Sequence, residues 1–413
     1  MTVHIIGGGL AGLAAALKCS ERGERVKIYE SAPMLGGRCR TFFDPTLGCD
    51  IDNGTHVVMP ANRAVMTYLG MIGARETLIA QPSDRIEMFD MLTERVIALR
   101  PSSVWNPFWL FMNDRRPPSV SAMDLIAGFM LAWANPRQTA DTALQSSAAA
   151  KYQLWDPFCT AVLNARLGQA DARLFGKSVA SLLASWHGPP IPHFADETLA
   201  ASFIRPAVRL LGSRNAEIAL TAPVTGMKIA NGRVSEISVN DMAQPVAAGD
   251  RVISTVPPWT PLIAPYLPES MRSWPVSAIV NVHYKVAHEL PGQFKGVLGS
   301  SGQWILVRRG IVSVTASAAG RWLETSAEEI GTVWWPGVAA ALGLPADAVP
   351  KFRVVKERRA TLMHGPGIDA ARASLPKIAT NFAVAGDWIR PGLPCSLEAA
   401  VQSGFAAASA SNA

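Results

Sequence analysis

The first thirty residues combine features that few folds allow. Apolar, mostly β-branched residues 3–6 predict a buried strand, and Gly7-Gly-Gly9-Leu-Ala-Gly12 follows at once. Residues 13–17 favour a helix, and residues 25–30 predict a second strand that ends in a carboxylate. Strand, glycine-rich turn, helix, strand and acid in this order predict a dinucleotide-binding βαβ unit.

Each glycine of this motif has a physical reason. Gly7 permits the tight turn, Gly9 lets the backbone approach a pyrophosphate, and Gly12 lets the helix pack close to the strand. The N-terminus of the helix presents free N–H groups and the positive end of its dipole to the phosphates, and Leu10 and Ala11, just before residue 13, are candidate cofactor contacts.

The residues after the second strand indicate which dinucleotide binds. Glu30, followed by Ser31, is placed to accept hydrogen bonds from a ribose diol. A nicotinamide domain would continue with further βαβ units, whereas this chain has Gly36-Gly37-Arg38 and then Asp52-Asn53-Gly54-Thr55-His56. This pattern resembles the superfamily of flavin-containing amine oxidases and carotenoid desaturases. The resemblance implies FAD, with Gly37 and Arg38 at its pyrophosphate region.

The far end of the chain supplies the matching half of the motif. Residues 381–385 predict a short strand, followed by Gly386-Asp387-Trp388 and then a helix from about residue 399. In the superfamily, Gly386 and Asp387 would meet the ribityl chain. The N-terminus of the last helix, around Ser396 and Leu397, would face the flavin O2 and N1 edge, where its dipole stabilises negative charge.

Residues 219–239 predict an antiparallel meander between these two ends. The resemblance places the backbone of Val224 against the adenine. We therefore expect an α/β (α+β) fold in which a Rossmann-like FAD-binding domain is discontinuous, comprising residues 1–80, 205–260 and 375–413. Residues 81–204 and 261–374 are expected to form an amine-oxidase-like substrate-binding domain of mixed sheet and helices.

Three segments narrow the resemblance to the squalene-associated FAD-dependent branch, the hydroxysqualene dehydroxylases. They are residues 52–56, Trp155-Asp-Pro-Phe-Cys-Thr-Ala-Val-Leu-Asn164 and the closing motif from Gly386 to Val401. The branch implies a reaction of squalene and hopanoid biosynthesis. A hydride passes from N5 of reduced FAD to the allylic carbon of hydroxysqualene that loses its hydroxyl group, and squalene forms.

The loop around His56 is the candidate catalytic region. Hydroxide is a poor leaving group, and His56 has the side chain in this loop that titrates near neutral pH, so it is a candidate proton donor. It would also contact the flavin together with Asn53, Gly54 and Thr55, and packing against the flavin is an alternative role for it. Asp52 is expected to fix the loop.

Two other functions stay open at this point. One is a desaturase, isomerase or oxidase of the same superfamily that acts on a carotenoid or an amine. The other is a non-catalytic carrier of prenyl lipids, against which the complete flavin-binding motifs argue.

No second glycine motif suits NAD(P)H, so electrons would come from NAD(P)H that visits transiently or from a separate reductase.

Composition limits the partners and the location. Five dispersed cysteines offer no metal-ligand spacing, and a net charge of +6 without long basic runs argues against nucleic acid. The start of the chain does not resemble a signal peptide, so a cytoplasmic protein is expected.

The aromatic-rich stretches 104–112 and 125–134 flank Arg115-Arg116. They predict either buried core or a peripheral contact with the inner face of the cytoplasmic membrane.

Overall fold

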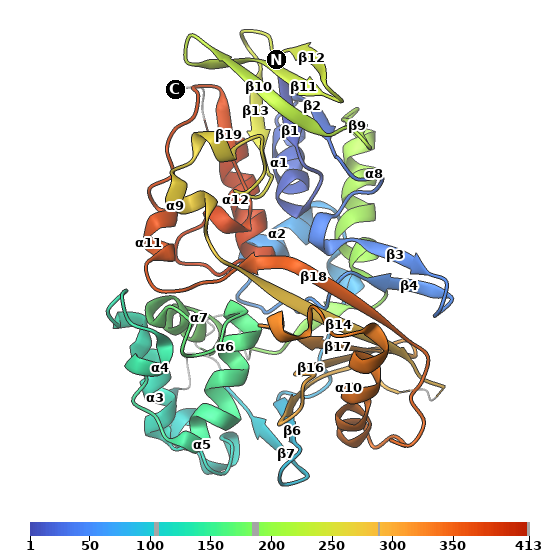
Figure 1. Cartoon of the computed structure of the whole chain (residues 1–413), viewed down its shortest axis with the longest axis vertical. Coiled ribbons are helices and arrows are strands. Elements are labelled where there is room, and N and C mark those ends of the chain that lie inside the picture. The colour runs from blue at the N-terminus through green and yellow to red at the C-terminus, as the bar shows by residue number, and fades with distance from the viewer. Residues whose placement is uncertain (103–106, 184–189, 288–289, 411–413) are drawn as a thin grey trace.

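The computed structural model describes residues 1–102, 107–183, 190–287 and 290–410 (Figure 1). A five-stranded sheet in the order β19-β13-β1-β2-β9 forms the upper part, and every neighbouring pair of strands is parallel. Its strands are β1 (Thr2–Ile6), β2 (Arg25–Tyr29), β9 (Glu217–Ala219), β13 (Arg251–Ser254) and β19 (Phe382–Val384). The predicted mixed α/β architecture with a Rossmann-like sheet is therefore confirmed, and the exact domain limits stay predictions.

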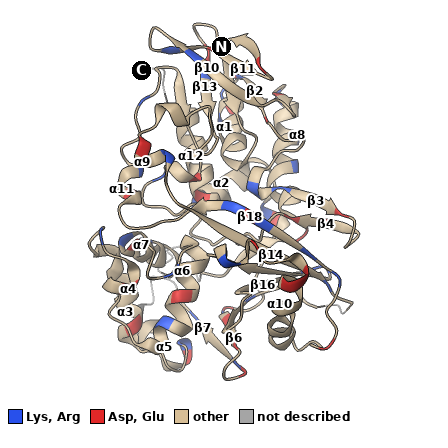
Figure 2. Ribbon diagram, viewed as in Figure 1, with Lys and Arg blue, Asp and Glu red and all other residues tan. Residues whose placement is uncertain are grey.

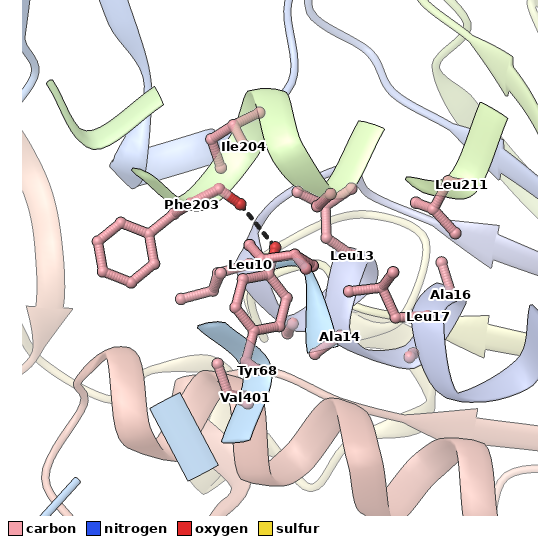
Figure 3. Packing of buried hydrophobic residues seen from close by; sticks show 14 of the residues in the cluster. Leu10, Leu13, Ala14, Ala16, Leu17, Tyr68, Phe203, Ile204, Leu211 and Val401 are labelled. Atoms are coloured by element: carbon pink, nitrogen blue, oxygen red, sulfur yellow. Dashed lines mark hydrogen bonds between the residues drawn. The ribbon is translucent and has the colours of Figure 1, made fainter. Parts of the chain in front are cut away.

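Four helices form a layer beside this sheet: α1 (Leu10–Glu21), α2 (Arg63–Met71), α8 (Arg205–Ser213) and α12 (Leu397–Ser409). Helices α1 and α12 contact its strands, while α2 packs against α12 and α8 against α1. Figure 3 shows Leu10 and Leu13 of α1 in one cluster with Val401 of α12, where the Tyr68 hydroxyl donates a hydrogen bond to the Phe203 carbonyl oxygen at 2.7 Å. A Cβ at Gly404 would lie 2.3 Å from the Ala11 carbonyl oxygen, so this glycine allows α1 and α12 to touch.

A small antiparallel sheet lies next to the parallel one and confirms the predicted meander. Its strands are β10 (Val224–Ala230), β11 (Arg233–Val239) and β12 (Met242–Pro245). Two short strand pairs complete this region: β3 (Thr41–Asp44) with β4 (Cys49–Asp52), and β5 (Leu78–Ala80) with β8 (His193–Ala195).

The lower part contains a seven-stranded mixed sheet in the order β18-β14-β17-β16-β15-β6-β7, in which β15 and β6 alone run parallel. Its strands are β6 (Ile86–Asp90), β7 (Arg95–Leu99), β14 (Val276–Lys285), β15 (Gln293–Leu298), β16 (Trp304–Arg308), β17 (Ile311–Ala316) and β18 (Phe352–Leu362). Helix α10 (Ala327–Leu342) packs on it through the buried Trp334 and Trp335. Lys and Arg residues, blue in Figure 2, lie along β18, which crosses between the two parts.

A lobe of helices lies beside this sheet. It contains α3 (Ala122–Met130), α4 (Ala140–Ala143), α5 (Ala148–Ala150), α6 (Asp156–Leu163) and α7 (Ala172–Leu183). Two further short helices, α9 (Glu269–Arg272) and α11 (Ile368–Arg372), lie near the parallel sheet (Figure 1). Among the described residues, none of the helices has the length and apolar character needed to cross a membrane.

Candidate active site

The glycine turn has the geometry that its sequence predicts. Gly7 has a φ of +104°, and its N–H donates a hydrogen bond to the Tyr29 carbonyl oxygen at 2.8 Å. A Cβ at Gly12 would lie 2.0 Å from the Gly7 carbonyl oxygen, so only glycine lets α1 pack this closely. A Cβ at Gly9 would meet no protein atom within 4 Å. The backbone before Leu10, the first residue of α1, is therefore open to a ligand.

Glu30 organises the end of β2. Its carboxylate accepts hydrogen bonds from the Gly8 N–H at 2.7 Å, the Ala32 N–H at 2.8 Å and the Ser31 hydroxyl at 3.2 Å. The Ala222 N–H donates to the Glu30 carbonyl oxygen, which brings the segment just before Val224 beside β2. Glu30 and Val224, which we predict to contact the ribose and the adenine, therefore lie at the same end of the parallel sheet.

The second glycine pair lies directly on the first turn. The Gly36 N–H donates to the Gly8 carbonyl oxygen at 2.9 Å. A Cβ at Gly37 would be 3.4 Å from the Gly9 Cα, so the two loops leave little room between their backbones. This contact places Arg38 next to the glycine turn.

Arg38 also reaches the other end of the chain. Its guanidinium donates to both oxygens of the Asp387 carboxylate and to the Ala360 carbonyl oxygen. Burial alone would raise the pKa of Asp387, but the Arg38 guanidinium outweighs it and holds that pKa below its usual range. The carboxylate is therefore ionised and hydrogen-bonded at neutral pH.

The loop at residues 53–56 is held by the mixed sheet. The Asn53 side-chain amide donates to the Glu357 carboxylate at 3.1 Å, and the Asn281 amide donates to the Asn53 carbonyl oxygen at 3.3 Å. Asn53 Oδ1 and Thr55 Oγ1 are buried without a hydrogen-bond partner in the protein. The loop thus carries unused polar atoms, as expected of a segment that binds a polar ligand.

Asp52 and His56 differ in their surroundings. The Asp52 carboxylate accepts from the Thr41 hydroxyl, the Leu199 N–H and the Arg308 guanidinium, the last at 2.7 Å, which agrees with its expected role of fixing the loop. Burial lowers the pKa of His56 below its ordinary value; the Asp52 charge works against this shift and the Arg38 charge adds to it. At neutral pH the His56 imidazole is therefore mostly uncharged.

The start of α12 is fixed by contacts on both sides. Ser396 is its N-cap and accepts from the Ala399 N–H at 3.3 Å, so the helix begins at Leu397, where the resemblance places its N-terminus. His364 Nε2 accepts the Cys395 N–H at 2.8 Å. Burial, helped by Arg372, lowers the pKa of His364 to about 3, so this imidazole is a neutral acceptor.

Sequence reasoning missed several residues that hold this site in place. They are Asn281, Arg308, Glu357 and His364, which lie between 269 and 357 positions from the glycine turn in segments without a motif. The open backbone at Gly9 and the unpartnered atoms of Asn53 and Thr55 fit an elongated, polar cofactor such as FAD. Among the described residues, no group of three His, Cys, Asp or Glu side chains could hold a metal ion.

Comparison with known proteins gives the family. The model of the flavin-containing amine oxidoreductases matches residues 10–410. The chain belongs to this family. It is accordingly an FAD-dependent oxidoreductase, and a non-catalytic lipid carrier is no longer a candidate. Cyclohexylamine oxidase from Brevibacterium oxydans shares the amine oxidoreductase fold, with a TM-score of 0.75 and 16% identity over 98% of this chain and 97% of that one.

Two members of the family are similar to the chain over nearly its whole length. The hydroxysqualene dehydroxylases of Zymomonas mobilis and Sinorhizobium fredii are each 31% identical to it over 407 residues. Each alignment covers 98% of this chain and 97% of the relative. The resemblance predicted from three short segments therefore extends across both parts of the fold.

Proposed function

We propose that the chain removes the hydroxyl group of hydroxysqualene reductively and releases squalene, as a step toward hopanoids. The observation that carries this proposal is the 31% identity over 98% of the chain to two proteins named for this activity. An apolar isoprenoid also suits the low share of charged residues, 17%.

The reaction requires a proton and a hydride: the C–O bond breaks, the oxygen leaves as water, and a C–H bond forms. Reduced FAD, when bound, supplies the hydride. The protein has to protonate the leaving hydroxyl group, because hydroxide leaves poorly, and to exclude water from the electron-deficient allylic carbon.

We assign the proton donor role to His56. It lies in the loop that we expect beside the flavin, and its lowered pKa makes its protonated form a stronger acid than an exposed imidazolium. The protonated form is scarce at neutral pH, so turnover should depend on that small population. Asp52 is less suited to the role, since its oxygens already accept three hydrogen bonds.

Other residues would hold the cofactor. Gly9 and the N-terminus of α1 suit the pyrophosphate, Glu30 the ribose, and the N-terminus of α12 the flavin edge that gains negative charge. Electrons would reach the flavin from outside the chain, from NAD(P)H or a separate reductase.

Because substrate and product are both water-insoluble, we also propose that the protein works at the inner face of the cytoplasmic membrane.

An anaerobic single-turnover experiment tests this function. The flavin of the holoenzyme is reduced and mixed with hydroxysqualene while its visible absorption is followed and squalene is measured. We expect one squalene for each flavin that is reoxidised. A flavin that stays reduced in folded, fully loaded protein would reject the proposal. Oxidised enzyme would then be tested with carotenoid precursors and amines, the substrates of the alternative functions.

A further inference from the structure

Large exposed apolar side chains are concentrated in one segment of the helical lobe. Six of them lie within 26 residues, and between 42% and 73% of each is exposed. They are Phe108, Phe111, Met112, Met123, Met130 and Trp133. We call them the α3 surface. Large apolar side chains that are exposed on neighbouring helices of a folded protein usually mark an interaction site.

Helix α3 lacks the polar outer side of an ordinary surface helix. Met123 and Met130 are seven positions apart, so they share one side of the helix, which faces solvent, whereas Leu125 is completely buried on another side. The one charged residue of α3, Asp124, is buried and accepts hydrogen bonds from Ser121, Ser146 and Ser147. The outward side of α3 therefore carries no charge.

A second short helix extends this surface. The 3₁₀ helix η3 (Pro107–Phe111) packs beside α3. Phe108 and Phe111 are three positions apart, which is one turn of a 3₁₀ helix, so both point outward while Trp109 between them is buried. Residues 104–106 of the aromatic-rich stretch lie outside the described residues.

The sequence predicts either buried core or a membrane contact for the aromatic-rich stretches 104–112 and 125–134. In the structure, different sides of the same helices have these two characters. Leu125 and Leu131 belong to the buried core of the lobe, as one interpretation predicts. Met123, Met130 and Trp133 face outward, as the other requires. The α3 surface lies at the end of the molecule away from both chain termini and the parallel sheet (Figure 1).

Two arginines that form no ion pair with a described residue border the apolar side chains, together with the exposed Asp114. The Arg116 guanidinium donates to the Met112 and Val120 carbonyl oxygens and to the Asn113 side chain, and Arg115 donates to the Arg100 carbonyl oxygen. Neither arginine forms an ion pair with a described residue. Arginine beside exposed aromatic and methionine side chains suits a surface of acyl chains and anionic headgroups.

We infer that the α3 surface docks on an anionic lipid bilayer. Phe108, Phe111, Met123 and Trp133 enter the boundary between headgroups and acyl chains, while Arg115 and Arg116 contact the headgroups. The inference deepens the proposed function, which supplies the reason for it, an apolar substrate. Binding to vesicles needs neither substrate nor turnover, so its failure is distinct from failure of the dehydroxylation.

Vesicle flotation with the holoenzyme tests the inference. The vesicles consist of phosphatidylcholine with about 30% phosphatidylglycerol, which makes their surface anionic. We expect the protein to bind them, and we expect this binding to weaken as the salt concentration rises. Phe108→Ser with Met130→Ser, and separately Arg115→Gln with Arg116→Gln, should each weaken it by about tenfold or more. Two matched controls should bind normally: Phe43→Ser, which removes a side chain 63% exposed on β3, and Arg209→Gln with Lys228→Gln.

Two results would overturn the inference. One is that the surface variants bind the vesicles as strongly as the unchanged protein does. The other is a concentration-dependent dimer, measured by light scattering, that the Phe108→Ser and Met130→Ser variant dissolves; the α3 surface would then contact a second copy of the chain. Thermal unfolding monitored by circular dichroism establishes that each variant is folded.

Discussion

The guanidinium of Arg38 donates hydrogen bonds at 2.8 and 2.7 Å to the carboxylate of Asp387, although 349 positions separate the two residues. Arg38 follows the glycine pair that lies on the first turn, and Asp387 belongs to the closing motif. The pair therefore holds the beginning of the chain to its end at the place where we propose that both contribute to the cofactor site.

Breaking this pair should reduce stability and flavin loading together. Arg38→Gln leaves Asp387 buried without its partner, and we expect a loss of about 2 kcal/mol in the free energy of unfolding at pH 7. The lowered pKa of Asp387 stabilises the native protein above the unfolded pKa, and this contribution disappears as pH falls through the folded pKa. The difference between variant and unchanged protein should therefore shrink below about pH 4 in urea titrations. A difference that is constant with pH would contradict this account.

Gly9 and Gly12 form a matched pair for testing the cofactor placement. Gly9→Val adds a side chain where the protein itself offers no obstacle, so the apoprotein should fold normally while FAD stoichiometry falls sharply. Gly12→Val would put a Cβ 2.0 Å from the Gly7 carbonyl oxygen, so it should destabilise the apoprotein itself. Absorbance of bound flavin and thermal unfolding of the apoprotein separate the two effects. Full flavin loading of the Gly9 variant would show that the pyrophosphate lies elsewhere.

The proposed role of His56 predicts a definite pH dependence. Since the protonated imidazole would donate and its pKa is lowered by burial, turnover should rise as pH falls toward a pKa below about 6.5. His56→Gln keeps a hydrogen-bonding side chain but cannot supply this proton, so kcat should drop about 10²-fold and lose that pH dependence. Bound flavin is measured in parallel as the control. An unchanged pH profile would leave His56 with a packing role.

The parts of this protein that could be predicted are those in which a short segment determines its own conformation. The glycine turn, with a positive φ at Gly7 and a close helix contact at Gly12, requires glycine for reasons visible in the sequence. The meander and the strand before Gly386 follow from local patterns in the same way. The conformations of the segments that we propose to line the cofactor site are therefore largely predictable.

The contacts that hold the loop at residues 53–56 could not be predicted. Asn281 and Glu357 are ordinary polar residues on long strands, and each reaches Asn53 only after β14 and β18 pair in the mixed sheet. No spacing in the sequence relates them to residue 53. The ion pair between Arg308 and Asp52 has the same origin, since their charges alone permit many other partners.

Glu398 illustrates how the closing motif also stabilises the fold. It stands in the first turn of α12, is nearly buried, and accepts the Ala64 and Val65 N–H groups, both at 3.0 Å. These two groups belong to the first turn of α2, where helix N–H groups lack partners within the helix. Glu398 therefore supplies a charged cap to a different helix from its own, at the favourable end of the dipole.

Replacing Glu398 should accordingly weaken the contact between α2 and α12. Glu398→Ala leaves two N–H groups without an acceptor, and we expect it to lower the free energy of unfolding by about 2–3 kcal/mol. Glu398→Gln keeps one acceptor oxygen and loses the charge, so it should recover about half of that loss. Hydrogen exchange at Ala64 and Val65, compared with exchange in α10, would show whether the weakening is local. Equal stability of the alanine and glutamine variants would mean that the carboxylate contributes through packing rather than through these hydrogen bonds.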